Sequence, residues 1–174
     1  MNVKYKSVTN KFRVIEERIR LPNGNTDVFS IIDAKPVVVI IPVKNGRLIL
    51  ERQYRPSIKR WLYELPAGVA GGVGYHGEPL KVLAAKELKE ETGYAASKLT
   101  YLFKSYAMAG SGNLVYHYFL AEELKAGRQT LEKWEIISVK EVTLQHAMSM
   151  IRKNEITDAK TIMGVLFYYN FVKK

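Results

Sequence analysis

The pattern of apolar and polar residues near the N-terminus predicts β-strands. The segments Phe12 to Arg20 and Asp27 to Ile32 flank Leu21-Pro22-Asn23-Gly24-Asn25. Asn-Gly is a strong signal for a hairpin turn, so these segments predict an N-terminal antiparallel hairpin. The run Pro36 to Val43, PVVVIIPV, is continuously apolar, which is typical of a strand that is buried on both faces.

Further segments with strand composition follow a second Asn-Gly turn at Asn45-Gly46. These predicted strands are Arg47 to Tyr54, Trp61 to Leu65, Leu99 to Met108, Leu114 to Ala121 and Trp134 to Val139. Between them, Pro66 to Gly72 is a loop of small residues, whose backbone can approach a metal or a phosphate. The segment Glu122 to Lys133 is polar and predicts another loop.

Three segments have helical periodicity. In the first, Glu78 to Thr92, Pro79 suits the first helical position and Gly93 suits the left-handed conformation just past the end. The other two are Val142 to Lys153 and Asp158 to Phe171. Their residues predicted to face the core are Met148, Met150, Ile151, Met163, Leu166 and Phe167.

Three carboxylates share one face of the first predicted helix. Glu87, Glu90 and Glu91 have i, i+3, i+4 spacing, and they continue the apolar stripe that contains Leu80 and Ala84. Like charges placed there repel one another, and a hard cation such as Mg²⁺ relieves the repulsion by taking carboxylate oxygens. The alternative is an ordinary Glu- and Lys-rich surface helix.

Composition limits the class of protein. The chain has 174 residues, of which 47% are hydrophobic and 25% charged, and this suits one globular domain with a substantial core. We expect N-terminal strands in residues 1–33 and the core domain in residues 34–174. There are no cysteines, which excludes a disulfide framework. Neither a membrane-spanning apolar run nor a secretory signal is apparent, so we expect a cytoplasmic protein with no membrane partner.

A formal net charge of +10 favours polyanionic partners, which include nucleotides, phosphorylated metabolites and nucleic acid. The basic residues are spread along the chain, and no nucleic-acid-binding motif is present. A generally basic surface is therefore favoured over a nucleic-acid interface.

The spacing around the carboxylates resembles the Nudix box. Gly72 is followed after five residues by Glu78, and seven further residues lead to KELKEETGY, residues 86–94. That motif usually has Arg where this chain has Lys86, and an aliphatic residue where it has Tyr94.

Further segments resemble the ADP-ribose pyrophosphatase branch of Nudix hydrolases. They are Arg52-Gln53-Tyr54-Arg55, then ELPAG at residues 64–68, and ITDAKT at residues 156–161, so the resemblance covers most of residues 36 to 165. In that branch the glycine of the PAG triplet opens the box. We therefore take Gly68 as its equivalent, although Gly72 satisfies the usual count.

This resemblance implies a fold, a reaction and a set of site residues. The fold is an α/β/α sandwich with a mixed sheet, and the reaction is hydrolysis of ADP-ribose to AMP and ribose 5-phosphate. The implied metal is Mg²⁺, with Mn²⁺ as a substitute. The implied metal ligands are Glu87, Glu90, Glu91 and the backbone carbonyl of Ala67. Arg55 matches an arginine that contacts the pyrophosphate.

Other expectations concern the surroundings of the site. Arg52 and Arg55, at the end of a strand, can both hold phosphate oxygens. Glu132 and Glu135 fall where the family has a mobile acidic segment near the active site. A solvated loop is the favoured interpretation, and the alternative is that either residue orients the attacking water. Enzymes of this branch are usually homodimers whose N-terminal strands cross to the partner, which implies a homodimer.

One departure affects the expected substrate range. Ala109-Gly110 stands where the branch commonly has Pro-Gly, which predicts a looser turn and hydrolysis of other ADP-sugars within roughly tenfold of ADP-ribose. Hydrolysis of another sugar nucleotide, or of capped or triphosphorylated RNA, stays open. So does a non-catalytic nucleotide-binding module with the same fold.

Overall fold

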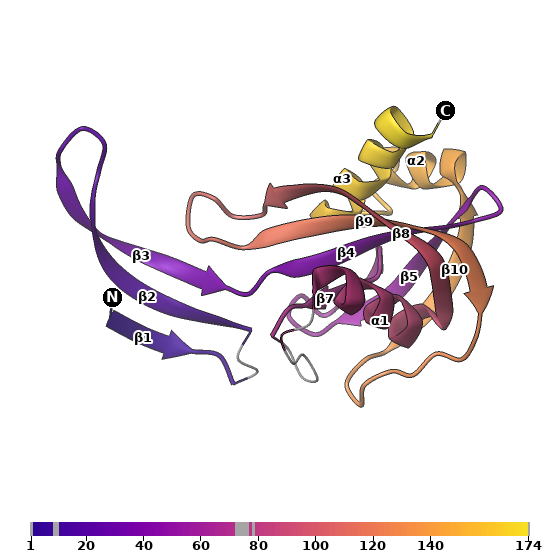
Figure 1. The fold of residues 1–174 in the computed structure, drawn as a ribbon, viewed down its shortest axis with the longest axis horizontal. Coiled ribbons are helices and arrows are strands. Elements are labelled where there is room, and N and C mark those ends of the chain that lie inside the picture. The colour runs from indigo at the N-terminus through magenta and orange to yellow at the C-terminus, as the bar shows by residue number, and fades with distance from the viewer. Residues whose placement is uncertain (1, 9–10, 72–76, 78, 174) are drawn as a thin grey trace.

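The computed structural model describes residues 2–8, 11–71, 77 and 79–173. The predictions made for Gly72 and Glu78 lie outside the described residues. The strands are β1 (Asn2–Lys6), β2 (Phe12–Arg20), β3 (Thr26–Ala34), β4 (Val37–Lys44), β5 (Arg47–Arg55), β6 (Arg60–Glu64), β7 (Ala67–Val69), β8 (Tyr94–Tyr106), β9 (Val115–Ala126) and β10 (Ile137–Thr143) (Figure 1). The helices are α1 (Leu80–Thr92), α2 (Leu144–Arg152), α3 (Ala159–Phe167) and a π-helical turn, η1 (Tyr168–Val172).

The larger sheet is mixed. Its main path runs β10-β5-β4-β9-β8, with β6 paired to β5 and β7 paired to β4. Strands β4 and β9 run parallel, from Val37 opposite Tyr116 to Pro42 opposite Ala121, and the other pairs of this sheet are antiparallel.

Helices cover both faces of this sheet because β4 contributes side chains to both. Val38 and Ile40 pack in the cluster that contains Leu83 and Leu88 of α1. The alternate residues of β4 pack in the cluster that contains α2 and α3; they are Val39 and Ile41. Successive side chains of a strand point to opposite faces, so a continuously apolar strand joins two layers. The predicted α/β/α sandwich is confirmed.

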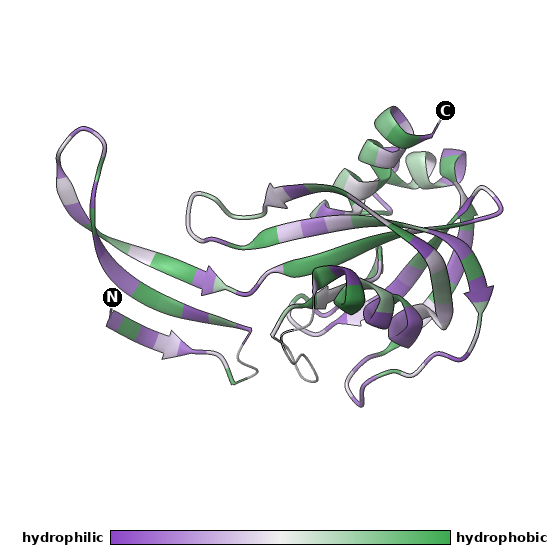
Figure 2. Cartoon of the chain, viewed as in Figure 1, coloured by the Kyte–Doolittle hydropathy of each residue, from purple (hydrophilic) through white to green (hydrophobic). Residues whose placement is uncertain are grey.

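Strands β1, β2 and β3 form a separate antiparallel sheet that projects from the main body (Figure 1). The hairpin β2–β3 was predicted, whereas β1 was not. Ile15 is buried in this sheet, but Tyr5, Val28 and Phe29 are exposed. Figure 2 shows hydrophobic residues along β2 and β3, away from the main core.

Several predicted boundaries are wrong by a few residues. Helix α1 begins at Leu80, and Pro79 is the N-cap residue rather than the first helical one. The polar segment Glu122–Ala126 continues β9 instead of forming a loop, because it pairs with β8 as far as Tyr94. Trp134 lies before β10 rather than in it.

The expected core positions of α2 and α3 are partly confirmed. Met150 is buried, and Met148 and Ile151 pack against the core. Met163, in contrast, is exposed, and Phe167 is half-buried and stacks on Phe103. Among the described residues, no helix has both the length and the apolar composition needed to span a membrane.

Candidate functional site

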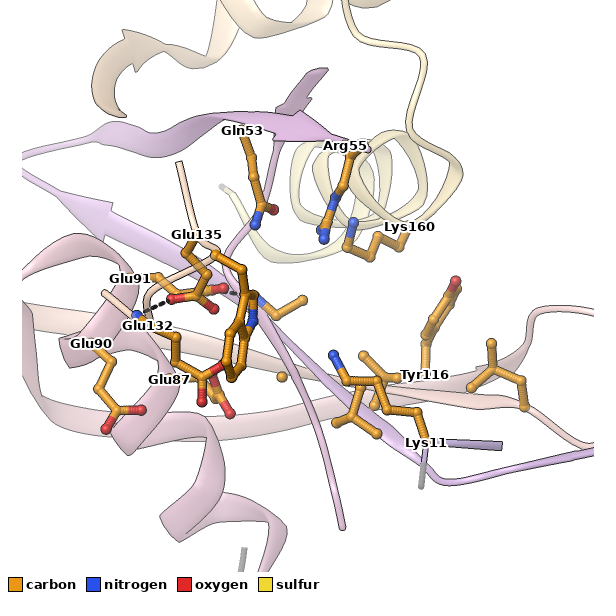
Figure 3. Close-up of a pocket in the computed structure, with 16 residues that line it drawn as sticks. Lys11, Gln53, Arg55, Glu87, Glu90, Glu91, Tyr116, Glu132, Glu135 and Lys160 are labelled. Carbon is orange, nitrogen blue, oxygen red and sulfur yellow. Dashed lines mark hydrogen bonds between the residues drawn. The ribbon is translucent and has the colours of Figure 1, made fainter. Parts of the chain in front are cut away.

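A pocket of about 490 Å³ lies between α1, the ends of β4, β5 and β7, and the segment before β10. Carboxylates gather on one side of the pocket and nitrogen-bearing side chains on the other (Figure 3). The pocket is lined by Lys11, Val37, Gln53, Arg55, Ala67, Gly68, Val69, Glu87, Glu90, Glu91, Leu114, Tyr116, Glu132, Trp134, Glu135 and Lys160.

The acidic side comes from α1 packed closely against β7. Glu91 is buried, and its Oε2 accepts a hydrogen bond of 2.9 Å from the backbone N–H of Ala67. Gly68 has no side chain, and a Cβ there would overlap the carboxyl group of Glu87. The small residues of β7 therefore let the carboxylates of α1 approach the backbone of the sheet.

Burial and crowding raise the pKa of these carboxyl groups. The pKa of Glu87 is raised to about 7, first by burial and then by the charges of Glu90 and Glu135. Burial also raises the pKa of Glu91 well above its ordinary value, and Glu51 and Glu87 add to this. The pKa of Glu51 rises to about 8 through burial and the charge of Glu64. Burial and the closeness of these carboxyl groups to one another thus disfavour the state in which all of them are ionised.

These residues fit a hard divalent cation. Glu51 is buried, and its Oε1 has no hydrogen-bond partner among the described residues. Its charge helps to raise the pKa of Glu91, so an uncompensated acceptor interacts with a carboxylate that lines the pocket. Carboxylate and carbonyl oxygens are the ligands that Mg²⁺ takes, and a cation would lower the mutual repulsion. Within the part of the chain that the structure describes, no three acidic or histidine side chains are already gathered in a metal-binding arrangement.

The opposite side of the pocket is basic. Arg55 donates from Nε and Nη2 to the two carboxylate oxygens of Glu64, each at 2.6 Å. The Nζ of Lys160 donates to the same carboxylate and to Asp158 Oδ2, the latter at 2.9 Å. Arg55 and Lys160 point into the pocket beside Gln53 (Figure 3).

The two arginines predicted to bind phosphate separate in the structure. Arg55 lines the pocket, but Arg52 does not. Arg52 is exposed, and its guanidinium lies 4.8 Å from the ring centre of Trp61. Arg55 lies three positions after Arg52 on β5, and an odd offset places the two side chains on opposite faces of the strand.

The acidic segment expected near the site does reach it. Glu132 and Glu135 both line the pocket. The backbone N–H of Glu132 donates to Glu135 Oε2 at 2.8 Å, which ties this segment into a compact turn.

Sequence reasoning missed several lining residues. Gln53 was detectable, since it lies two residues before Arg55 and must share its face of β5. Lys160 was noted only as part of a resembling segment. Lys11 and Trp134 had no local signal, because each enters the pocket from a connection whose path depends on the fold.

The turn before β9 is fastened rather than loose. The N–H of Ile32 donates to Ser111 O at 2.9 Å, and the N–H of Asn113 donates to Ile32 O at 3.2 Å. Asn113 Oδ1 accepts from the N–H of Ala34 at 2.8 Å. These contacts hold residues 111–113 against β3. The expected hydrolysis of other ADP-sugars stays a prediction.

Known proteins resemble this chain in sequence and in fold. The model of the NUDIX domain matches residues 34–163. The ADP-ribose pyrophosphatase of Bacillus subtilis (strain 168) is 34% identical over 154 residues, which cover 87% of this chain and 81% of the relative. The GDP-mannose pyrophosphatase of Escherichia coli O1:K1 / APEC is 29% identical over 133 residues, which cover 72% of this chain and 68% of the relative.

A solved structure described as an ADP compounds hydrolase has the same fold. It superposes with a TM-score of 0.81 at 21% identity and covers 99% of this chain and 92% of its own. Nudix enzymes generally use a divalent metal, in keeping with the carboxylate-rich pocket. The chain therefore belongs to the Nudix family, as a pyrophosphatase hydrolase related to the ADP-ribose and GDP-mannose pyrophosphatases.

Proposed function

We propose that this enzyme hydrolyses the pyrophosphate of a nucleoside diphosphate sugar, with ADP-ribose as substrate and AMP and ribose 5-phosphate as products. The observation that supports this is one pocket in which Glu87, Glu90 and Glu91 face Arg55. A substrate pyrophosphate is negatively charged, so it needs a cation such as Arg55 to hold it. It also needs the carboxylate side of the pocket, where a bound metal would promote attack. The relative of 34% identity that is named an ADP-ribose pyrophosphatase supports the choice of sugar nucleotide.

In this proposal each side of the pocket has a role. The carboxylates of Glu87, Glu90 and Glu91 and the carbonyl oxygen of Ala67 would hold Mg²⁺, or Mn²⁺ in its place. Bound metal supplies neutralisation of the charge that develops during cleavage and lowers the pKa of a bound water. Arg55 binds the pyrophosphate oxygens.

The proton of the attacking water goes to a carboxylate of the segment before β10. Glu132 and Glu135 both line the pocket, and a general base must lie within hydrogen-bond reach of the water, directly or through another water. Burial and the charge of Glu135 raise the pKa of Glu132, which moves it toward the range useful for a base. Arg52 lies outside the pocket, so we assign the pyrophosphate contact to Arg55.

A panel of substrates tests this function. We expect kcat/KM with Mg²⁺ to be highest for ADP-ribose among ADP-ribose, ADP-glucose, GDP-mannose and dGTP. We expect dGTP to be a poor substrate. Its phosphates form a terminal chain, whereas we expect Arg55 to bind a pyrophosphate that links two sugar groups. A clear preference for GDP-mannose or dGTP would overturn the substrate and leave the Nudix chemistry in place. Absence of hydrolysis across the panel would favour a binding module.

A further inference from the structure

Glu64 holds the guanidinium of Arg55 along one edge. The Nε and Nη2 atoms of Arg55 donate to the Oε1 and Oε2 atoms of Glu64, both at 2.6 Å. This parallel pair fixes the plane of the guanidinium, because two bonds define both its position and its rotation. The Nη1 group remains on the opposite edge, and the side chain of Arg55 is 37% exposed while that of Glu64 is 1% exposed.

Glu64 is itself held by residues of α3 and its N-cap. Lys160 Nζ donates to Glu64 Oε2 and to Asp158 Oδ2, at the N-terminus of α3. The same Asp158 oxygen accepts from the N–H and the hydroxyl of Thr161, at 2.9 and 2.6 Å. The hydroxyl of Thr161 in turn accepts from the N–H of Leu65 at 2.8 Å. The carboxylate of Glu64 is therefore tied to α3 on one side and to Arg55 on the other.

The charges in this network balance. Arg55 and Lys160 are cations, and Glu64 and Asp158 are anions that the two cations contact. Burial and hydrogen bonding act in opposite directions on Glu64, and the contacts with Arg55 and Lys160 leave its pKa below the ordinary value. Glu64 thus carries its charge at neutral pH, and removal of one member would leave a buried charge with too few partners.

The open side of the network is the pocket. Arg55 and Lys160 both line it, whereas Glu64 does not. We propose that Glu64 and Lys160 are positioning residues that fix the guanidinium of Arg55 for a substrate pyrophosphate. This deepens the proposed function and rests on it. Without them, Arg55 would have to be ordered by the substrate at each binding event, which lowers affinity.

Kinetics of three variants test the positioning role. We expect Glu64→Gln and Lys160→Met to raise KM for ADP-ribose by about tenfold, with kcat changed less than about threefold, since substrate binding is weakened more than the chemical step. Glu64→Asp retains the charge but shortens the side chain, and we expect the same rise in KM with the fold kept. The matched control is Glu122→Gln, which breaks the exposed pair of Lys98 and Glu122 at 2.7 Å and should leave KM unchanged.

A double-mutant cycle separates positioning from mere stability. If Glu64 acts through Arg55, Glu64→Gln added to Arg55→Ala should lower kcat/KM no further than Arg55→Ala alone. Added guanidinium should restore activity to Arg55→Ala but not to the double variant, because Glu64 would hold the free ion. A melting temperature for every variant shows whether the fold is kept.

The outcomes distinguish two failures. A wild-type protein that hydrolyses no compound of the substrate panel overturns the proposed function, and the positioning role falls with it. An active wild type whose Glu64→Gln and Glu64→Asp variants keep a normal KM overturns the positioning role alone. Additive effects of Arg55→Ala and Glu64→Gln on kcat/KM would overturn it as well.

Discussion

At the scale of single residues, the carboxylates of α1 decide what the pocket can do. Glu91 is buried against Ala67, and Glu87 lies over Gly68. These carboxylates repel one another, and under the proposed function a bound cation would relieve that repulsion by taking their oxygens as ligands.

The first prediction removes one of these charges while keeping the shape of the side chain. We expect Glu90→Gln and Glu91→Gln each to lower kcat by at least ~10²-fold, about 3 kcal/mol of transition-state stabilisation. The melting temperature without metal should hold or rise, because repulsion with Glu87 is relieved. Steady-state rates with Mg²⁺ and thermal denaturation check both statements. Near-normal activity of both variants would show that the metal ligands lie elsewhere.

The second prediction concerns Glu51. Its pKa is about 8 in the folded protein, whereas the ordinary value is 4.5. Between these two pH values the carboxyl group is protonated in the folded state and ionised in the unfolded state. Stability is therefore present at low pH and is lost as the pH rises toward 8. Glu87, with a pKa of about 7, contributes in the same direction. We expect the metal-free protein to melt roughly 5 °C lower at pH 8 than at pH 5.5.

The variant Glu51→Gln assigns this pH dependence. It should flatten the dependence of the melting temperature on pH and raise the melting temperature at pH 8, because no buried carboxylate forms. Glu141→Gln is the control, since Glu141 is largely exposed on β10 and its pKa is lowered by Tyr94 and Lys44. A slope that is the same in wild type and Glu51→Gln would contradict the assignment.

At the scale of elements, the turn before β9 joins the two sheets. A Cβ at Gly112 would lie 2.5 Å from the backbone oxygen of Ile32, and Gly110 has no atom within 4 Å of such a position. The backbone of the turn therefore comes close to β3 at Gly112 but not at Gly110.

The third prediction compares these two glycines. Gly112→Ala should push the turn away from β3 and destabilise the protein by roughly 1–3 kcal/mol. It should also raise KM, because Leu114, two residues on, lines the pocket. Gly110→Ala should change neither the stability of the protein nor its KM by a measurable amount. Chemical denaturation and KM for ADP-ribose check the pair, and equal effects of the two substitutions would rule out a specific contact with β3.

At the scale of the whole molecule, the sheet of β1, β2 and β3 keeps exposed apolar residues, although β3 contacts the turn before β9. Tyr5, Val28 and Phe29 are exposed on it, and the sheet extends away from the main body (Figures 1 and 2). Exposed apolar strands invite pairing with another chain.

The fourth prediction is that the protein is a homodimer joined through this sheet. Deletion of residues 1–33 should give a monomer and raise KM more than it changes metal binding. Val28→Glu should weaken the dimer, and Val82→Glu on α1, equally exposed, should not. Light scattering at micromolar concentration measures the assembly. A full-length protein that is monomeric there would refute the prediction.

The sequence by itself determined the features that depend on local spacing. The 3.6-residue period of α1 set Glu87 and Glu91 on the same face as Leu83 and Leu88, and the apolar run of β4 set a strand buried on both faces. Gly93 ends α1 in the left-handed conformation, as its position predicted. Such features need no knowledge of distant residues, because neighbours along the chain fix them.

Only the tertiary structure decided which distant residues meet. Glu64 and Lys160 are 96 residues apart and belong to different layers, so no local pattern could pair them. Pairing of β9 with β8 overrode the polar composition of Glu122–Ala126, since one face of that strand end is exposed and tolerates charge. The N-terminal sheet likewise fastened the turn at Gly112 through a backbone contact that side-chain identities do not encode. The physical reason is common to all three: sheet pairing and layer packing bring together groups whose separation along the chain carries no periodic signal.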